Sequence, residues 1–219
     1  MSLTVLERVV PHPDGPPPAY AQTSSHVGHP MRVLTEAMAT DPGSWSDAQR
    51  REVAAFFDEL APEWHTRAEG PGRDLPLRDA FARGVPADVR GACAEVGSGI
   101  GLTSDVVAER FAPTLAVEIS PEMARRSPVG PAHRVLADGA CLPVADASLD
   151  AVVLMNAFLF APECARVLRP GGALVWVNSR GPETPIHLPA ETVVETLPGD
   201  WKAVASEAGT ATWCVALKP

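Results

Sequence analysis

Residues 92–107, ACAEVGSGIGLTSDVV, contain a glycine-rich turn between two segments of regular secondary structure. A short apolar run precedes the turn and a helix-like run follows it. Three glycines occupy alternate positions, at Gly97, Gly99 and Gly101, and Glu95 stands two residues ahead of the first. Glycine lets the backbone adopt positive φ and lets a ligand approach without a Cβ in the way. The stretch therefore predicts a strand, a ligand-binding turn and a helix.

The spacing of these glycines separates two classes of ligand-binding turn. The dinucleotide fingerprint G-x-G-x-x-G, counted from Gly97, needs a third glycine at residue 102, where this chain has Leu102. The G-K-[ST] ending of a phosphate-binding P-loop is absent as well. We expect the next helix to start near Ile100 and to direct backbone N–H groups at a ligand. The pattern disfavours an NAD(P)-dependent oxidoreductase, which stays open as an alternative.

From residue 91 onward, apolar runs of strand length alternate with helix-like runs. The strand-like runs are GACAEVG, TLAVEIS, HRVLAD, LDAVVLMNA, GGALVWVNS, WKAVASEAG and TATWCVALKP. Strands that alternate with helices predict a parallel sheet covered on both faces. The last two runs leave no room for a helix between them, so we expect an antiparallel hairpin at an edge. The predicted fold class is α/β, with a Rossmann-like, seven-stranded, mostly parallel sheet and an N-terminal helical lid.

The first ninety residues differ from the rest of the chain. Residues 1–45 are rich in proline, which disfavours helices and interrupts sheet ladders, so we expect an extended arm there. In residues 46–90, Ser46 and Gln49 fit a capping box, and an apolar stripe at helical spacing follows. The stripe consists of Val53, Phe57, Leu60 and Trp64. We therefore divide the chain into an arm (1–45), a helical lid (46–90) and a ligand-binding core (91–219).

Composition restricts the partners and the compartment. The formal net charge is −9 and no run of Lys and Arg is present, which argues against nonspecific binding to nucleic acid or anionic membranes. The chain starts without the charge pattern of a signal peptide, and no stretch approaches the ~18 apolar residues of a membrane span, so we expect a cytoplasmic protein. The scattered cysteines predict reduced, mostly buried thiols and no metal site. They are Cys93, Cys141, Cys164 and Cys214.

Two acids follow the second and third strand-like runs of the core. Glu118 lies 21 residues after Gly97, and a carboxylate at this place can accept hydrogen bonds from both hydroxyls of a ribose. Asp138 is followed by Gly139 and Ala140, so an acid and adjacent backbone N–H groups can bind the edge of an adenine ring. Asp-Gly also commonly starts a turn without any ligand. Together with the glycine turn, the two acids favour an adenosine ligand.

Four segments together resemble the class I S-adenosylmethionine-dependent methyltransferases, and the nearest type is the ubiquinone/menaquinone C-methyltransferase group. The segments are AEVGSGIG, Glu118, ADGACLPVADASLDAVV and ECARVLRPGG. FFDELAPEWHTR also resembles the short N-terminal motif of that group, which often carries Tyr-Asp where this chain has Trp64-His65. This departure leaves open whether the chain keeps the substrate of the group.

The resemblance implies S-adenosyl-L-methionine as the cofactor and a small-molecule acceptor, either lipid-like or a secondary metabolite. It implies the following cofactor contacts: Glu95, Gly97, Ser98, Gly99 and Gly101 at the methionine moiety and ribose, Glu118 at the ribose hydroxyls, Ile119 against the adenine, Asp138, Gly139 and Ala140 at the adenine edge, and Asn156 near the sulfonium. A protein that binds S-adenosylmethionine or S-adenosylhomocysteine without turnover is a second hypothesis. We expect no nucleic-acid partner, and the sequence is compatible with a homodimer.

A general base is needed only if the acceptor must lose a proton, and histidine is the natural candidate. His65 follows the predicted lid helix, and His187 follows the fifth strand of the core. Trp64 either bounds the acceptor pocket and touches the sulfonium through a cation–π contact, or closes the apolar stripe as a core residue. We therefore predict His65 and His187 as catalytic candidates and Trp64 as a cofactor contact.

Overall fold

The computed structural model of the chain describes residues 1–10, 28–68 and 72–219. Its eight strands form one sheet in the order β1-β7-β8-β6-β5-β2-β3-β4. The strands are β1 (Ser2–Val5), β2 (Cys93–Val96), β3 (Thr114–Glu118), β4 (His133–Leu136), β5 (Leu149–Met155), β6 (Leu168–Asn178), β7 (Lys202–Ala208) and β8 (Ala211–Leu217). Only β8 runs antiparallel to its neighbours among these strands. The carboxyl ends of the parallel strands consequently meet at one edge of the sheet, where ligands bind in folds of this kind.

The predicted fold class is confirmed, with one strand more than expected. The additional strand is β1, which lies in the segment predicted as an extended arm and pairs in parallel with β7. Its residues, SLTV, precede the proline-rich stretch, so each of them can take part in a ladder. The antiparallel C-terminal hairpin of β7 and β8 is present, but β1 forms the outer edge of the sheet beside it.

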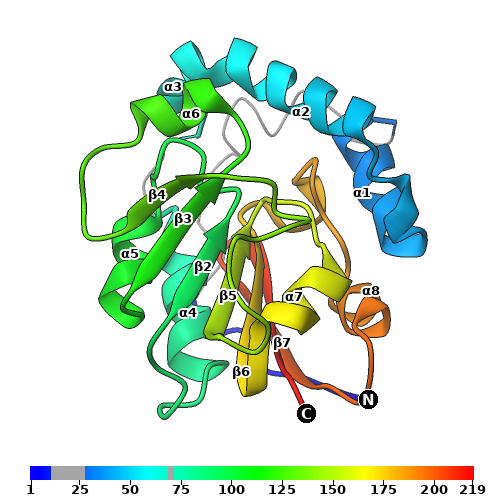
Figure 1. Ribbon diagram of the computed structural model, residues 1–219. Coiled ribbons are helices and arrows are strands. Elements are labelled where there is room, and N and C mark those ends of the chain that lie inside the picture. Colours follow the sequence, from blue (N-terminus) through cyan, green and yellow to red (C-terminus); the bar gives the residue numbers. More distant parts are fainter. Residues whose placement is uncertain (11–27, 69–71) are drawn as a thin grey trace.

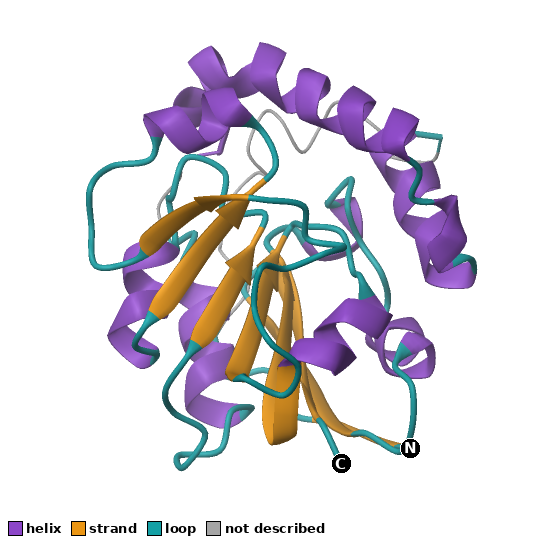
Figure 2. Ribbon diagram, in the orientation of Figure 1, coloured by secondary structure: helices purple, strands orange, loops and turns teal. Residues whose placement is uncertain are grey.

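Helices cover both faces of the sheet (Figure 2). The α-helices are α1 (Pro30–Thr40), α2 (Asp47–Leu60), α3 (Trp64–Ala68), α4 (Leu75–Arg83), α5 (Ser104–Arg110), α6 (Pro121–Arg126), α7 (Ala161–Val167) and α8 (Ala190–Thr196). Successive side chains of a strand point to opposite faces of the sheet. In β5, Ala151 and Val153 therefore pack on the face covered by α4 and α5. Val152 and Leu154 pack on the other face, with α7 and α8. Both faces of the central strands are therefore buried, which explains their continuous apolar sequences.

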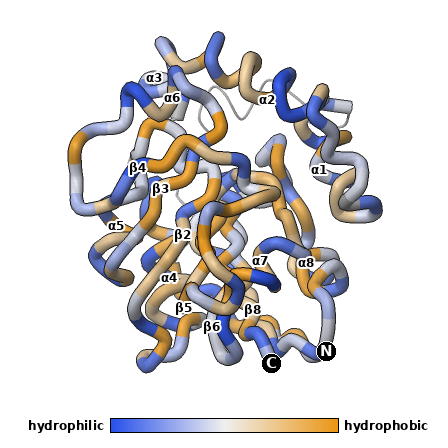
Figure 3. The backbone as a smooth tube through the Cα atoms, viewed as in Figure 1, coloured by the Kyte–Doolittle hydropathy of each residue, from blue (hydrophilic) through white to orange (hydrophobic). Residues whose placement is uncertain are grey.

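The helices α1, α2 and α3 form a cap, here called the lid, above the carboxyl ends of the strands (Figure 1). In Figure 3 hydrophobic and hydrophilic segments alternate along the lid helices α1 and α2. The expected capping box begins α2, since Ser46 Oγ accepts from the Gln49 N–H and the Gln49 side chain accepts from the Ser46 N–H. Pro62 lies in a short 3₁₀ turn (Ala61–Glu63) between α2 and α3, because proline cannot continue the helix.

The helix α4 lies within residues 46–90, which were predicted as the lid, but it packs on one face of the sheet against β7 and β8. Pro76 lies in its first turn and Gly84 follows its last residue. Its buried residues Leu77 and Phe81 belong to the core under the sheet. Of the α-helices described within residues 46–90, α2 and α3 therefore lie over the carboxyl ends of the strands, and α4 does not. Within the described ranges, no helix is long and apolar enough to cross a membrane.

Candidate active site

The glycine turn after β2 uses left-handed backbone geometry at every second residue. The φ angles of Gly97, Gly99 and Gly101 are +72°, +58° and +80°. A Cβ on Gly97 would lie 2.6 Å from the Cβ of Ala157, so a side chain is excluded there by space as well as by φ. The helix α5 begins only at Ser104, which corrects the expected start near Ile100. Repeated positive φ is the reason, because a right-handed helix cannot pass through such residues.

Glu118, the last residue of β3, points its carboxylate at this turn. Its Oε2 accepts a hydrogen bond of 2.7 Å from the Gly99 N–H. Its Oε1 accepts from the N–H groups of Ile119 at 2.8 Å and Ser120 at 2.7 Å. Burial raises the pKa of Glu118 above its usual value, and the three backbone donors oppose that shift. A carboxylate has about four acceptor positions, so capacity remains for a ligand.

Asp138 follows β4, and both oxygens of its carboxylate accept hydrogen bonds. Its Oδ1 accepts from the Ala140 N–H at 2.8 Å. The indole Nε1–H of Trp45 lies 3.2 Å from Oδ1 and 3.1 Å from Oδ2. The Trp45 ring also lies against Phe158 and Phe160, with centroids 5.8 and 5.3 Å away. Trp45, which lies in the connection between α1 and α2 and which sequence reasoning missed, thus contacts the predicted adenine-edge acid.

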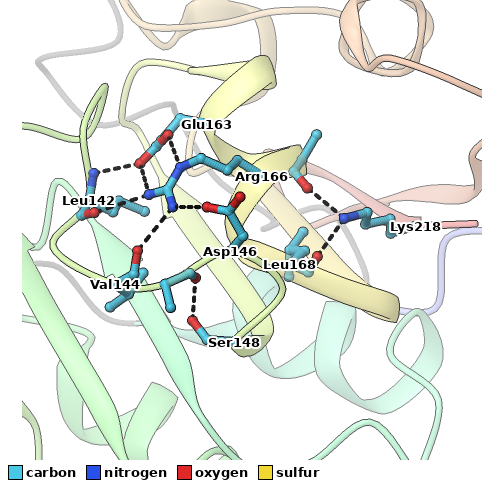
Figure 4. A network of polar contacts seen from close by, with 10 residues as sticks. Leu142, Val144, Asp146, Ser148, Glu163, Arg166, Leu168 and Lys218 are labelled. Atoms are coloured by element: carbon cyan, nitrogen blue, oxygen red, sulfur yellow. Dashed lines mark hydrogen bonds and ion pairs between the residues drawn. The ribbon is translucent and has the colours of Figure 1, made fainter.

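The loop after Asp138 is fastened to α7 by the network drawn in Figure 4. Glu163 accepts from the Leu142 N–H at 2.6 Å, and Arg166 binds Glu163 and donates to the carbonyl oxygens of Leu142 and Val144. Arg166 also pairs with Asp146 at 2.6 Å. These contacts lie away from the glycine turn, so their role is to fix the path of the loop that carries Asp138.

These elements surround one cavity of about 860 Å³, its open mouth included. Its lining contains these predicted residues: Trp64, Gly97, Ser98, Gly99, Glu118, Ile119, Asp138, Gly139 and Asn156. The lining leaves out Glu95, Gly101, Ala140, His65 and His187. It adds Trp45, Arg73, Phe158 and Phe160, which the sequence did not single out. Of these, only Trp45 carried a local signal, since it directly precedes the Ser46 cap, where an apolar residue often fixes the entry to a helix.

Glu95 is buried beneath the turn and does not reach the cavity. Its carboxylate accepts hydrogen bonds from the hydroxyl groups of Thr103 at 2.8 Å and Ser104 at 2.5 Å. Burial raises the pKa of Glu95 to about 7, although both hydroxyl groups oppose the shift. Glu95 therefore joins the end of β2 to the start of α5 and supports the glycine turn from below.

The two predicted histidines are not at the cavity. His65 is exposed on α3. His187 is buried, and its Nδ1 lies 3.2 Å from Nη1 of Arg32 on α1. An arginine side chain can only donate, so Nδ1 must be the acceptor and His187 carries its proton on Nε2. Burial, followed by the charge of Arg32, lowers the pKa of His187 to about 4. The placement of His187 thus fits a structural contact with the lid better than proton transfer.

Comparison with known proteins agrees with this geometry. Residues 94–176 match a family described as "Methyltransferase domain". A demethylmenaquinone methyltransferase from Corynebacterium urealyticum is 29% identical over 167 residues, which span 71% of this chain and 73% of that protein. Residues 94–176 of this chain therefore form a methyltransferase domain.

Two solved structures share the fold of this methyltransferase. The DhpI–SAH complex superimposes with a TM-score of 0.62 at 16% identity, covering 80% of this chain and 100% of that one. The [4+2]-cyclase SpnF gives a TM-score of 0.59 at 18% identity, covering 78% and 97%. Identities this low establish the architecture only.

The site has the features that an adenosyl sulfonium ligand requires. A turn whose first glycine excludes any Cβ allows close approach of the backbone, and a buried carboxylate with remaining acceptor capacity stands beside it. Aromatic side chains, including Trp45 and Phe160, border the cavity near Asp138. These features fit S-adenosyl-L-methionine, the cofactor that the resemblance implies, which supplies a methyl group activated on a positively charged sulfur.

Proposed function

We propose that this methyltransferase acts on an apolar small-molecule acceptor. The observation that carries the proposal is the apolar part of the cavity lining, here called the acceptor wall. The lid contributes Val53, Phe57 and Trp64 to the lining, and the core contributes Met155, Phe158 and Ile186. An apolar wall with a few polar groups is typical of small-molecule sites. The similarity to a demethylmenaquinone methyltransferase supports an acceptor that carries a flat, apolar ring.

We assign the polar lining residues to the cofactor. Glu118 would accept a hydrogen bond from the ribose through the acceptor position that the three backbone donors leave, Ile119 would pack on the adenine, and Asp138 with Gly139 would bind the adenine edge. The turn of Gly97, Ser98 and Gly99 would lie along the methionine moiety. Arg73 lines the same cavity, and its positive charge suits the carboxylate of that moiety. These contacts account for the charged groups of the lining.

Asn156 and Trp64 border the place where donor and acceptor would meet. Asn156 has a positive φ of +53°. Its side chain is held by two hydrogen bonds to Ser179, with its Oδ1 accepting from the backbone N–H at 2.9 Å and its Nδ2 donating to Oγ at 2.8 Å. Trp64 stands edge-on to Phe57, with ring centroids 5.7 Å apart. A side chain locked in this way can fix a near-attack arrangement, which is the main requirement for an in-line transfer.

The enzyme contributes to the reaction mainly by positioning the methyl donor and the acceptor and by excluding water from the cavity. Positive charge disappears from sulfur as the methyl group leaves, so a cavity that excludes water favours the transfer. His65 and His187 are outside the lining, and the described residues that line the cavity include no histidine. We therefore propose an acceptor whose nucleophilic atom is already electron-rich, such as an ionised hydroxyl group or an activated ring carbon.

Two measurements test the proposal in order. Titration calorimetry with S-adenosylmethionine, S-adenosylhomocysteine and NAD should give binding heat with the first two only. A panel of methyl acceptors should then be screened by the release of S-adenosylhomocysteine, with apolar ring compounds (phenols included), charged amino acids and RNA as its three arms. Turnover confined to the apolar ring compounds supports the proposal. Turnover confined to the charged amino acids or to RNA contradicts it, and cofactor binding without any turnover favours the non-catalytic alternative.

A further inference from the structure

Trp45 links the lid to the adenine side of the cavity. It directly precedes the capping box of α2, and its indole N–H donates to the Asp138 carboxylate. We propose that Trp45 is a positioning residue through which the lid recognises the adenine ring, so that cofactor binding and assembly of the acceptor wall are coupled. This inference rests on the proposed assignment of Asp138 to the adenine edge.

The carboxylate of Asp138 can accept a further hydrogen bond from a ligand in addition to those from Trp45 and Ala140. A carboxylate offers about four acceptor positions, and the Ala140 N–H and the indole N–H use part of them. The guanidinium of Arg50, one turn into α2, lies 4.0 Å from Oδ2. The indole therefore orients Asp138, and the exocyclic amine of an adenine finds a carboxylate that is already turned toward it. A purine with a carbonyl oxygen in place of that amine would instead meet a second acceptor.

The far end of α2 is fastened to the other cofactor loop. Asp58 accepts hydrogen bonds from Ser120 Oγ at 2.5 Å and from the Glu122 N–H at 3.0 Å. Ser120 also donates its N–H to Glu118, the predicted ribose ligand. The helix α2 is therefore attached at one end to the loop that carries Asp138 and at the other to the loop that follows Glu118.

The same helix carries part of the acceptor wall. Val53 and Phe57 lie between the two attachments and line the cavity. A ligand that strengthens the contacts of α2 with the cofactor loops also holds this wall in place. Because coupling between two sites is reciprocal, an acceptor that binds the ordered wall must tighten cofactor binding by the same factor. The arrangement predicts that bound cofactor tightens the binding of the acceptor.

The test compares the whole protein with Trp45→Phe, which keeps an aromatic ring and removes the N–H donor. Calorimetry should give the ratio of the dissociation constants of S-inosylhomocysteine and S-adenosylhomocysteine. We expect the wild-type protein to prefer the adenosyl compound by about tenfold or more, and the variant to lose most of that preference. Phe56→Leu is the matched control, since Phe56 lies on α2 outside the cavity lining, and it should keep the wild-type ratio.

Hydrogen exchange provides a second measurement, the slowing of amide exchange that S-adenosylhomocysteine causes. A purely structural role of Trp45 would not change this effect of the ligand. S-adenosylhomocysteine should slow amide exchange both in residues 47–60 and in residues 97–101 of the wild-type protein. In Trp45→Phe the slowing should persist in residues 97–101 and be lost in residues 47–60. If the variant keeps both the ratio and the slowing in α2, the inference is wrong while the proposed function stands. If the wild-type protein does not bind S-adenosylhomocysteine at all, the proposed function fails and takes the inference with it.

Discussion

The backbone N–H of Gly99 donates a hydrogen bond of 2.7 Å to Oε2 of Glu118, which joins the glycine turn after β2 to the carboxylate that ends β3. The other oxygen is held by Ile119 and Ser120, so backbone donors fix the whole group. A ligand therefore meets an acceptor whose orientation is already set, and less conformational freedom is lost on binding. The two loops act as one unit because this carboxylate connects them.

Replacing this carboxylate should weaken cofactor binding selectively. Glu118→Gln keeps the size of the side chain but turns one acceptor oxygen into a donor, which we expect to weaken S-adenosylhomocysteine binding by about tenfold or more. Calorimetry provides the measurement. Glu122→Gln is the control, because Glu122 pairs with Arg125 and Arg126 at the surface of α6. Equal affinity of Glu118→Gln and wild type would mean that the ribose is bound elsewhere.

Alanine substitutions at two glycines with similar φ should distinguish the cost of backbone strain from the cost of a steric clash of the new Cβ. Gly97 and Gly171 have φ values of +72° and +76°, so alanine at either should cost about 1–2 kcal/mol. At Gly97 the new Cβ would also lie 2.6 Å from Ala157 Cβ, whereas nothing lies within 4 Å at Gly171. We expect Gly97→Ala to lose a further ~1–3 kcal/mol from overpacking. Urea unfolding of both variants measures the difference, and equal losses would exclude the collision.

Glu95 should make the protein less stable as the pH rises toward neutrality. Burial raises its pKa from 4.5 to about 7, so the folded protein holds the proton more tightly than the unfolded chain. The resulting stabilisation is complete below pH 4.5 and is lost as the pH rises to about 7. At about 1.4 kcal/mol for each pH unit, the loss is of the order of 3 kcal/mol.

Glu95→Gln, which imitates the protonated acid, should remove this pH dependence. Unfolding free energies of the variant and wild type should therefore diverge between pH 4.5 and 7, with the variant becoming relatively more stable at the higher pH. Parallel curves for the two proteins would show that Glu95 titrates normally.

His187 should stay neutral throughout the physiological range. Burial and Arg32 lower its pKa to about 4, so the folded protein resists the proton that the unfolded chain takes up near pH 6.5. The associated stability is present above pH 6.5 and declines as the pH falls toward 4, opposite in sign to that of Glu95. An NMR titration should find no change at the His187 ring between pH 6 and 8, and a midpoint near 6.5 would refute the placement. Arg32→Met should raise the His187 pKa.

Much of the fold and part of the site followed from local patterns. The strand-length apolar runs and the capping box at Ser46 each depend on neighbours within a few residues, and the structure confirms them. The short strand β1 escaped prediction because four residues carry no period of their own and are ordered by β7, which lies about two hundred residues away in the sequence. The start of α5 was misplaced because three consecutive alternations of positive φ delay the helix.

The sequence by itself determined that a glycine turn follows the first core strand and that acids lie at or just after the ends of the next two strands, since glycine geometry and strand periodicity are local properties. Only the tertiary structure decided what these groups face. Trp45 meets Asp138 across 93 positions and Arg32 meets His187 across 155, and no local pattern encodes such pairs. They arise because a lid must bury its apolar face on the core, and that packing selected Trp45 for the cavity and turned both predicted histidines away from it.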